Sequence, residues 1–518
     1  MARFYIENFG CRATQADGAA LERQFLERGL ERAGAARDAE IVVLNTCTVT
    51  SGADKDARAS IRRVRRANPE CKILVTGCYA QRAPAELAAL PGVRWVVGNS
   101  HKHQVAQIAT SASSSAGFVT LAQLLGEPRN PLVRTERQLV GRPVLGQFPQ
   151  DQLSPDQPVN VIVGDIFAHT ELLAAPVFEA ANERTRPNLK VQDGCDNRCS
   201  FCVIPYVRGQ SRSLRPERVI AEVRTLVAAG YREVVISGIN LGRWGRDLES
   251  STQHLALSTQ PKPTTRDQQL ESLVHSIIEQ TSLEKLRISS VEPMDWSDEL
   301  IGLMASSERI AKHAHVPMQS GSDAVLRRMH RKYRPWHYRE KILKIRAAMP
   351  SAAIGADVMV GFPGETEAEF DETRRMIEDL PFTYLHVFTY SARPGTPAAR
   401  SPGRVAPTAA RERNRTLREL ASQKKAAFAR SLVGTIVKAI TLQSGGPEFT
   451  EALTDNYLRI RIPGQREANR WLEVEVAALE GETLVGQQGA GAGDIRSSTL
   501  GLGCATCGSL ASDSKVHP

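Results

Sequence analysis

Residues 191–202 read Val-Gln-Asp-Gly-Cys-Asp-Asn-Arg-Cys-Ser-Phe-Cys, which places Cys195, Cys199 and Cys202 in one short loop. A 4Fe-4S cluster normally has four cysteine ligands, so a cluster held by three keeps one iron open to a substrate. A structural zinc ion would need a fourth ligand nearby, but the chain has no His between His169 and His254 and no other Cys close to the loop. The spacing therefore predicts a catalytic iron–sulfur cluster.

The composition is that of an ordinary soluble protein. The chain has 518 residues, 42% of them hydrophobic and 24% charged, a length that suits about three domains. No run of apolar residues is long enough to span a membrane, and the first residues lack the apolar core of a signal peptide. We therefore expect a cytoplasmic monomer that does not bind membranes. Nine cysteines then suit metal ligation better than disulfides.

The first hundred residues predict an α/β domain with a parallel sheet, because short apolar runs alternate with amphipathic helices near 15–33 and 53–66. Cys11, Cys47 and Cys78 each follow one of these runs. Since the carboxyl ends of parallel strands share one edge of a sheet, these cysteines can converge and hold a second cluster with an open iron. The alternative is that each is a buried core cysteine. Cys71 begins its strand, at the opposite edge, and is interpreted as structural.

Residues 187–396 repeat a strand-then-helix pattern six times, with helices expected at 215–229 and 367–379. The strands are expected at 189–191, 233–236, 286–288, 313–316, 354–360 and 385–388. This pattern predicts an open, partial barrel with the three-cysteine loop after its first strand. Chemistry in βα barrels lies just beyond the strand ends, although ordinary turns use the same residue types. The candidates there are Ser237, Gly238, Asn240, Ser290, Glu292, Gln319, Ser320 and Gly321, with residues 361–366 and 393–396.

The cysteine spacing resembles that of the radical S-adenosylmethionine (SAM) superfamily. Within it, residues 191–202, 287–293, 319–323 and 360–366 look like the methylthiotransferase family, and with Cys11, Cys47 and Cys78 the resemblance covers most of residues 2–435. It implies two 4Fe-4S clusters, held by Cys195, Cys199 and Cys202 and by the three N-terminal cysteines. One SAM would methylate a sulfur at the N-terminal cluster, and a second, cleaved at the barrel cluster, would remove a hydrogen from the substrate.

The same resemblance implies positions around SAM. Ser237 and Gly238 would border its amino group, Glu292 its ribose, and Gln319 and Ser320 the floor of the active site. Phe201, within the cysteine loop itself, is also expected to bind the cofactor.

The sequence motifs around the three N-terminal cysteines favour one substrate. Gly10-Cys-Arg-Ala-Thr-Gln, Asn45-Thr-Cys-Thr-Val-Thr and Val75-Thr-Gly-Cys-Tyr-Ala-Gln look like the subgroup that acts on N6-threonylcarbamoyladenosine at tRNA position 37, with Ala13 as a small departure. Isopentenyladenosine in tRNA and an aspartate of a ribosomal protein remain alternatives. A protein of another class, an iron–sulfur sensor that binds RNA without catalysis, is a further alternative. Against it stands the predicted barrel of six strand-helix units, which binding alone would not require. The reaction also requires a sulfur donor and an electron donor.

Basic segments support a tRNA anticodon stem-loop as the partner. The net charge is +9, residues 58–66 hold five arginines, and residues 400–430 hold nine Lys or Arg against two Glu. Residues 327–339 mix cations with aromatic side chains, which suits phosphate contacts and base stacking. Each segment could also be a solvated helix face. Short alternating strands between 432 and 487 predict a small β-barrel that resembles a TRAM domain, where Arg459 and Arg461 would touch RNA.

The predicted organisation is therefore α/β with three folded parts. Residues 1–105 form the N-terminal cluster domain, 106–185 a linker or insertion, 186–431 the radical SAM barrel, and 432–490 the TRAM-like β-barrel. Residues 491–518 are expected to be a disordered tail, in which Cys504 and Cys507 form an isolated pair.

Overall fold

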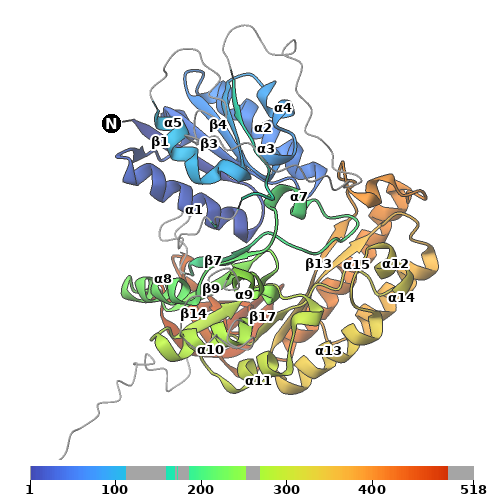
Figure 1. Cartoon of the computed structure of the whole chain (residues 1–518). Helices are drawn as coiled ribbons and strands as arrows, with labels where there is room; N and C mark the ends of the chain where they lie inside the picture. Colours follow the sequence, from blue (N-terminus) through green and yellow to red (C-terminus); the bar gives the residue numbers. More distant parts are fainter. Residues whose placement is uncertain (1, 112–158, 170–171, 173–185, 252–268, 488–518) are drawn as a thin grey trace, which may run out of the picture.

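The computed structural model describes residues 2–111, 159–169, 172, 186–251 and 269–487. Figure 1 shows the N-terminal domain lying across the open barrel, with α7 (Ile204–Arg208) between them. Among the described residues, no helix is long and apolar enough to cross a membrane. The predicted tail with Cys504 and Cys507, and residues 112–158 of the predicted linker, lie outside the described part.

The N-terminal domain is a six-stranded parallel sheet in the order β2-β1-β3-β4-β5-β6. Its central strand, β3, is buried along its whole length because its residues are Ile-Val-Val-Leu-Asn-Thr. The strands are β1 (Arg3–Asn8), β2 (Glu31–Arg32), β3 (Ile41–Thr46), β4 (Lys72–Gly77), β5 (Val93–Gly98) and β6 (Asn160–Ile162). The helices are α1 (Arg12–Glu27), α2 (Ser51–Ala67), α3 (Cys78–Arg82), α4 (Pro84–Ala88) and α5 (Val105–Thr110).

Two details of this domain differ from the sequence-based expectation. The first helix stops at Glu27 instead of near 33, because Gly29 takes a positive φ of 76° and turns the chain back towards β2. Residues 160–162, placed in the predicted linker, form the edge strand β6 beside β5. A three-residue strand carries too little apolar pattern to be found without its partner.

The central domain is an open barrel of six parallel strands, as predicted. They are β7 (Asn188–Asp193), β9 (Glu233–Gly238), β10 (Lys285–Ile288), β11 (His313–His315), β12 (Ala353–Val360) and β13 (Tyr384–Thr389). Single bridges between Leu286 and Ile310 and between Ser290 and His315 join its two sheets. A short antiparallel strand, β8 (Arg212–Ser213), pairs with β7. The helices are α8 (Pro216–Ala228), α9 (Arg246–Ser251), α10 (Leu270–Gln280), α11 (Asp298–Ser306), α12 (Asp323–Arg328), α13 (Pro335–Ala348), α14 (Glu367–Asp379) and α15 (Pro407–Arg430).

The two faces of the barrel strands have different chemistry. Alternate residues such as Val234, Leu286 and Ile354 join the apolar core beneath the helices. The residues between them point the other way, into the barrel, because side chains alternate along a strand. These inner residues are mostly polar or aromatic: Asn188, Lys190, Gln192, Glu233, Arg287, His313, His315, Asp357, Tyr384 and His386.

The C-terminal domain is a closed β-barrel, which confirms the third part of the predicted fold class. Its strands are β14 (Ile436–Gly446), β15 (Phe449–Thr454), β16 (Arg459–Pro463), β17 (Trp471–Glu480) and β18 (Thr483–Gln487), in the order β14-β15-β16-β18-β17. Its loop carrying Asp455 and Tyr457 reaches into the base of the central barrel, where Arg287 donates to the carbonyl of Asp455 at 3.0 Å. The two barrels are thus joined by buried polar contacts.

Candidate functional site: two sets of three cysteines

The barrel cysteine loop is held by two other barrel units. The backbone of Ser200 donates to Met329 O at 3.1 Å and accepts from Ala398 N at 2.9 Å, and its hydroxyl donates to Arg328 O at 2.7 Å. Phe201 packs edge-on against Phe362, with 6.4 Å between ring centroids. The loop is therefore anchored to the segments that contain Met329 and Ala398.

Hydrogen-bond donors point at the sulfur atoms of this loop. Arg331 Nη1 lies 3.3 Å from Cys199 Sγ, and Asn240 Nδ2 lies 3.7 Å from Cys195 Sγ. Burial raises the pKa of Cys202 to about 12 and that of Cys195 to about 11, so these thiols are protonated unless a metal displaces the protons. Donors aimed at sulfur are among the features that tune iron–sulfur clusters.

The predicted strand-end residues differ in what they can offer a ligand. Ser237 is buried and its hydroxyl has no hydrogen-bond partner in the described part of the chain. Gly238 leaves room for Gln192, whose Oε1 would lie 2.8 Å from an added Cβ. Glu292 forms an ion pair with Arg331. The Ser320 hydroxyl is already engaged by Thr373, at 3.0 Å.

Gln319 is the one strand-end candidate other than glycine with a positive φ. Its φ is +63°, and its N–H and C=O both bond to β12, at Asp357 O and Met359 N, each at 2.8 Å. These bonds hold the turn after β11 against the neighbouring strand.

The structure also brings the three N-terminal cysteines together. Cys11, Cys47 and Cys78 follow β1, β3 and β4, which are neighbours in the sheet. A Cβ at Gly10 would lie 2.9 Å from Cys47 Sγ, so only glycine allows the first turn to approach the second. Burial, followed by Cys78 and Cys11, raises the pKa of Cys47 to about 12. Cys71 is buried in the apolar core before β4, at the other end of that strand.

One cysteine of the N-terminal set lies against the barrel domain, close to the end of the barrel cysteine loop. Cys78 packs against Val203 and Val207, directly after the barrel loop. Asn99 donates to Val207 O at 2.7 Å and to Cys78 Sγ at 3.5 Å. Cys78 of one set therefore lies against the segment that continues from Cys202 of the other.

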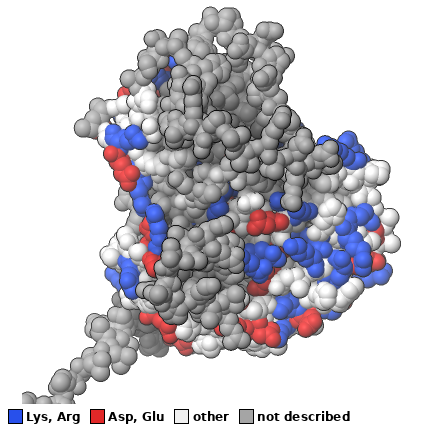
Figure 2. All heavy atoms as spheres, in the orientation of Figure 1, with Lys and Arg blue, Asp and Glu red and all other residues white. Residues whose placement is uncertain are grey.

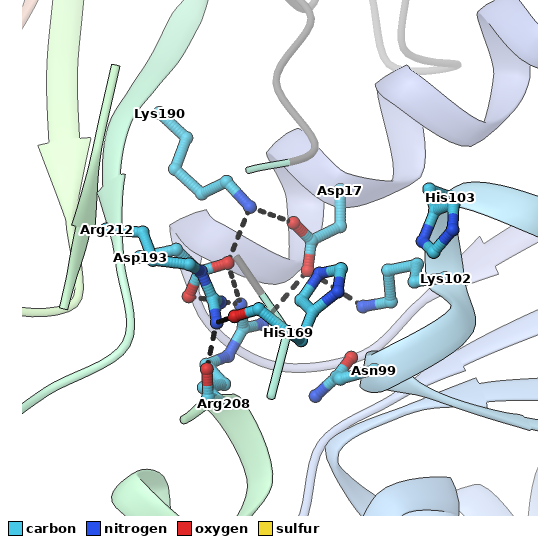
Figure 3. A pocket seen from close by; sticks show the side chains of 9 residues that line it. All are labelled: Asp17, Asn99, Lys102, His103, His169, Lys190, Asp193, Arg208 and Arg212. Atoms are coloured by element: carbon cyan, nitrogen blue, oxygen red, sulfur yellow. Dashed lines mark hydrogen bonds and ion pairs between the residues drawn. The ribbon is translucent and has the colours of Figure 1, made fainter. Parts of the chain in front are cut away.

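A buried ion-pair network fills the space beside this contact and was not predicted (Figure 3). Arg208 donates to both oxygens of Asp193, at 2.9 and 3.0 Å, and to Asp17 at 3.0 Å. Lys190 bridges the same two carboxylates, and Lys102 contacts Asp17 at 2.8 Å. Burial alone would raise the pKa of Asp17, but the three cations outweigh it and hold that pKa below its usual range. Charges from both domains thus stabilise one interface.

The basic segments are only partly available at the surface. Figure 2 shows Lys and Arg gathered on the side of the molecule where α12 to α14 lie. The stacking role predicted for the tyrosines in 327–339 is wrong, because Tyr333 and Tyr338 are buried in the core, whereas Trp336 is 56% exposed. Arg459 and Arg461 both lie on the exposed face of β16, as their alternation predicts.

An open barrel of six βα units with a three-cysteine loop after its first strand is the architecture of a radical SAM enzyme. Residues 189–377 match the sequence model of the family described as "Radical SAM superfamily". Residues 3–98 match the model described as "Uncharacterized protein family UPF0004". Membership of the superfamily implies one 4Fe-4S cluster and SAM.

Curated relatives define the family more closely. Threonylcarbamoyladenosine tRNA methylthiotransferase MtaB of Bacillus subtilis (strain 168) is 35% identical over 90% of this chain and 92% of its own. The protein of the same name from Aquifex aeolicus (strain VF5) is 33% identical over 90% and 98%. A tRNA-2-methylthio-N(6)-dimethylallyladenosine synthase of Oceanobacillus iheyensis is 27% identical over 93% and 83%. The chain belongs to the threonylcarbamoyladenosine tRNA methylthiotransferase family.

Proposed function

We propose that this protein adds a methylthio group to carbon 2 of N6-threonylcarbamoyladenosine at position 37 of tRNA. The observation that carries the proposal is the packing of Cys78, from the N-terminal set, against Val203 and Val207, which follow Cys202 of the barrel set, since the transfer requires both sets to face one substrate. The names of the relatives with 31–35% identity support the choice of nucleoside.

In this proposal Cys195, Cys199 and Cys202 hold one 4Fe-4S cluster, and Cys11, Cys47 and Cys78 hold a second. When bound, the clusters would supply the electron that cleaves SAM and the sulfur that is transferred. The fit of the second set rests on its three converging thiols and the Asn99 donor at 3.5 Å. The adjacent network also supplies positive charge, because Lys102, Lys190 and Arg208 outnumber Asp17 and Asp193, and a cluster with three thiolates is an anion.

The chain's own residues would position SAM. The Ser237 hydroxyl and Asn240 Oδ1, which have no hydrogen-bond partner among the described residues, can bind its polar groups. Gly238 would border the SAM amino group from the same turn, where its lack of a side chain lets Gln192 approach. Gln319 and Ser320 would form the floor of the active site, where Ser320 holds the turn through its contact with Thr373. Phe201 and Phe362 shield the cysteine loop from water, and Glu292 is oriented by Arg331 for a ribose hydroxyl.

The test is anaerobic modification of tRNA that carries threonylcarbamoyladenosine, followed by digestion and mass spectrometry. Cys78→Ala should abolish the methylthio product and lose the iron of one cluster, while SAM is still cleaved to 5′-deoxyadenosine. Cys71→Ala is the matched control, because this buried cysteine lies at the other end of β4 and should change neither readout. A Cys78→Ala enzyme with full iron content and normal product would contradict the second cluster.

The same assay decides between the alternatives. Product on isopentenyladenosine or on a ribosomal-protein aspartate, but not on threonylcarbamoyladenosine, would replace the proposed substrate. Absence of 5′-deoxyadenosine from protein with both clusters filled would favour an RNA-binding sensor. We further propose a cytoplasmic monomer that binds the anticodon stem-loop and receives its electrons from an electron donor and its sulfur from a sulfur donor.

A further inference from the structure

One wall inside the barrel carries a row of three aromatic rings, two of which are exposed. Tyr384, His386 and Phe388 alternate along β13, with ring centroids 5.3 and 6.5 Å apart. Phe388 is 47% exposed, and His386 is also exposed. Gly355 on β12 makes room for the Tyr384 ring, because a Cβ there would lie 2.5 Å from a ring carbon. Such a row on an edge strand is suited to stacking an unpaired base.

Polar groups accompany these rings at one level of the wall. His315, Asp357 and His386 bring their side-chain nitrogen and oxygen atoms within 4.8 Å of one another. They come from β11, β12 and β13, and Asp357 is the direct neighbour of His386 across the strands. Burial lowers the pKa of His386, and His315 and Arg12 add to this effect although Asp357 opposes it. A neutral imidazole and a carboxylate together can both donate and accept hydrogen bonds.

The base of the same space carries excess positive charge. Burial alone would raise the pKa of Tyr457, but the positive charges of Arg12, Arg186 and Arg287 lower it. Arg12 Nη2 also donates a hydrogen bond to the Tyr457 hydroxyl at 3.1 Å. Glu233 neutralises part of this charge by pairing with Arg186 at 3.3 Å and Arg287 at 2.6 Å. Arg12 has no carboxylate partner among the described residues, and it directly follows Cys11.

The upper end of the wall reaches the cysteine loop. Met359 lies two residues beyond Asp357 on β12, a step of roughly 6.6 Å, and it joins Phe201 in one apolar cluster. Carbon 2 and N6 of adenine flank N1 on the same edge of the base, so a base whose carbon 2 lies at the cysteine loop would place its N6 substituent at the neighbouring level of His315, Asp357 and His386.

We propose that this wall binds the modified adenosine, with its base on His386 and Phe388 and the threonyl carboxylate on Arg12. Asp357 then accepts the urea N–H of the substituent. The inference rests on the proposed function and makes Arg12 the residue that selects a charged substituent, because an isopentenyl group offers nothing to a guanidinium.

The test measures binding of fluorescent anticodon stem-loops to the enzyme with both clusters, without reductant. The RNAs carry threonylcarbamoyladenosine, isopentenyladenosine or adenosine at position 37. Wild-type protein should prefer the first, and Arg12→Gln should weaken only that RNA, by about tenfold or more. Arg12→Lys should retain part of the preference. His386→Ala should weaken all three RNAs by about tenfold.

Arg37→Gln is the matched control, since this exposed arginine lies on the N-terminal domain beside Asp38, and it should bind all three RNAs as the wild type does. Iron content equal to wild type shows that Arg12→Gln leaves the adjacent Cys11 site folded. An unchanged preference in that variant would overturn the site while leaving the proposed function intact. Failure of the wild type both to prefer and to modify the threonylcarbamoyl RNA would overturn both. A zinc ion lost on His386→Ala would assign the three side chains to a metal instead.

Discussion

Replacing Gly77 with alanine should destroy the N-terminal cysteine site while leaving the barrel site intact. Gly77 has φ 100° and ψ −163°, a conformation that is essentially restricted to glycine and costs other residues about 1–3 kcal/mol. An added Cβ would also lie 2.6 Å from the backbone nitrogen of Thr46 and closer still to its oxygen. Because both atoms belong to the central strand β3, the turn must move, and Cys78 moves with it.

The assay is iron and acid-labile sulfide per chain after anaerobic reconstitution, together with thermal unfolding. Gly29→Ala is the control, because Gly29 also has a positive φ of 76° but nothing within 4 Å of an added Cβ. It should cost only about 1 kcal/mol and keep full iron content. A Gly77→Ala protein that binds as much iron as Gly29→Ala would refute the argument that this turn positions Cys78.

Three further results are expected. Asp17→Asn leaves Lys190 and Arg208 with only Asp193 as a carboxylate partner and Lys102 with none among the described residues. It should therefore destabilise the domain interface by about 3–5 kcal/mol and speed hydrogen exchange in α1; unchanged exchange would contradict this. Since the cations hold the Asp17 pKa below its usual range, its contribution to stability is present above about pH 4 and is lost as pH falls further. The Asp17→Asn variant should therefore lose less stability than the wild type as the pH falls below about 4, as measured by acid unfolding followed by tryptophan fluorescence. Arg331→Met removes the donor 3.3 Å from Cys199 Sγ and should lower the reduction potential of the barrel cluster in an electron paramagnetic resonance titration; an unchanged potential would mean the contact has no electronic effect.

The local sequence determined the elements and the order in which they follow one another. Apolar runs separated by amphipathic helices predicted all six barrel strands, and Thr366 with Glu369 forms a capping box that starts α14 where expected. The convergence of Cys11, Cys47 and Cys78 was also predictable, because each follows a strand and parallel strands end at one edge. The alternation in Leu189-Lys-Val-Gln already indicated one apolar and one polar face on this strand. Only the folded barrel shows that the polar face points into its interior.

Only the tertiary structure decided which distant charges and rings share a site. Asp17 pairs with Lys190 across 173 residues of sequence, and Arg12 meets Tyr457 across 445, so no local pattern could connect them. Arg331 and Tyr333 read as surface residues in a basic segment, yet both are buried, and Arg331 contacts Cys199. Secondary structure follows from the spacing of apolar residues over short stretches, which can be read directly from the sequence. Pairing between buried charges depends instead on how whole domains pack, because their desolvation is offset only by partners that folding brings into contact.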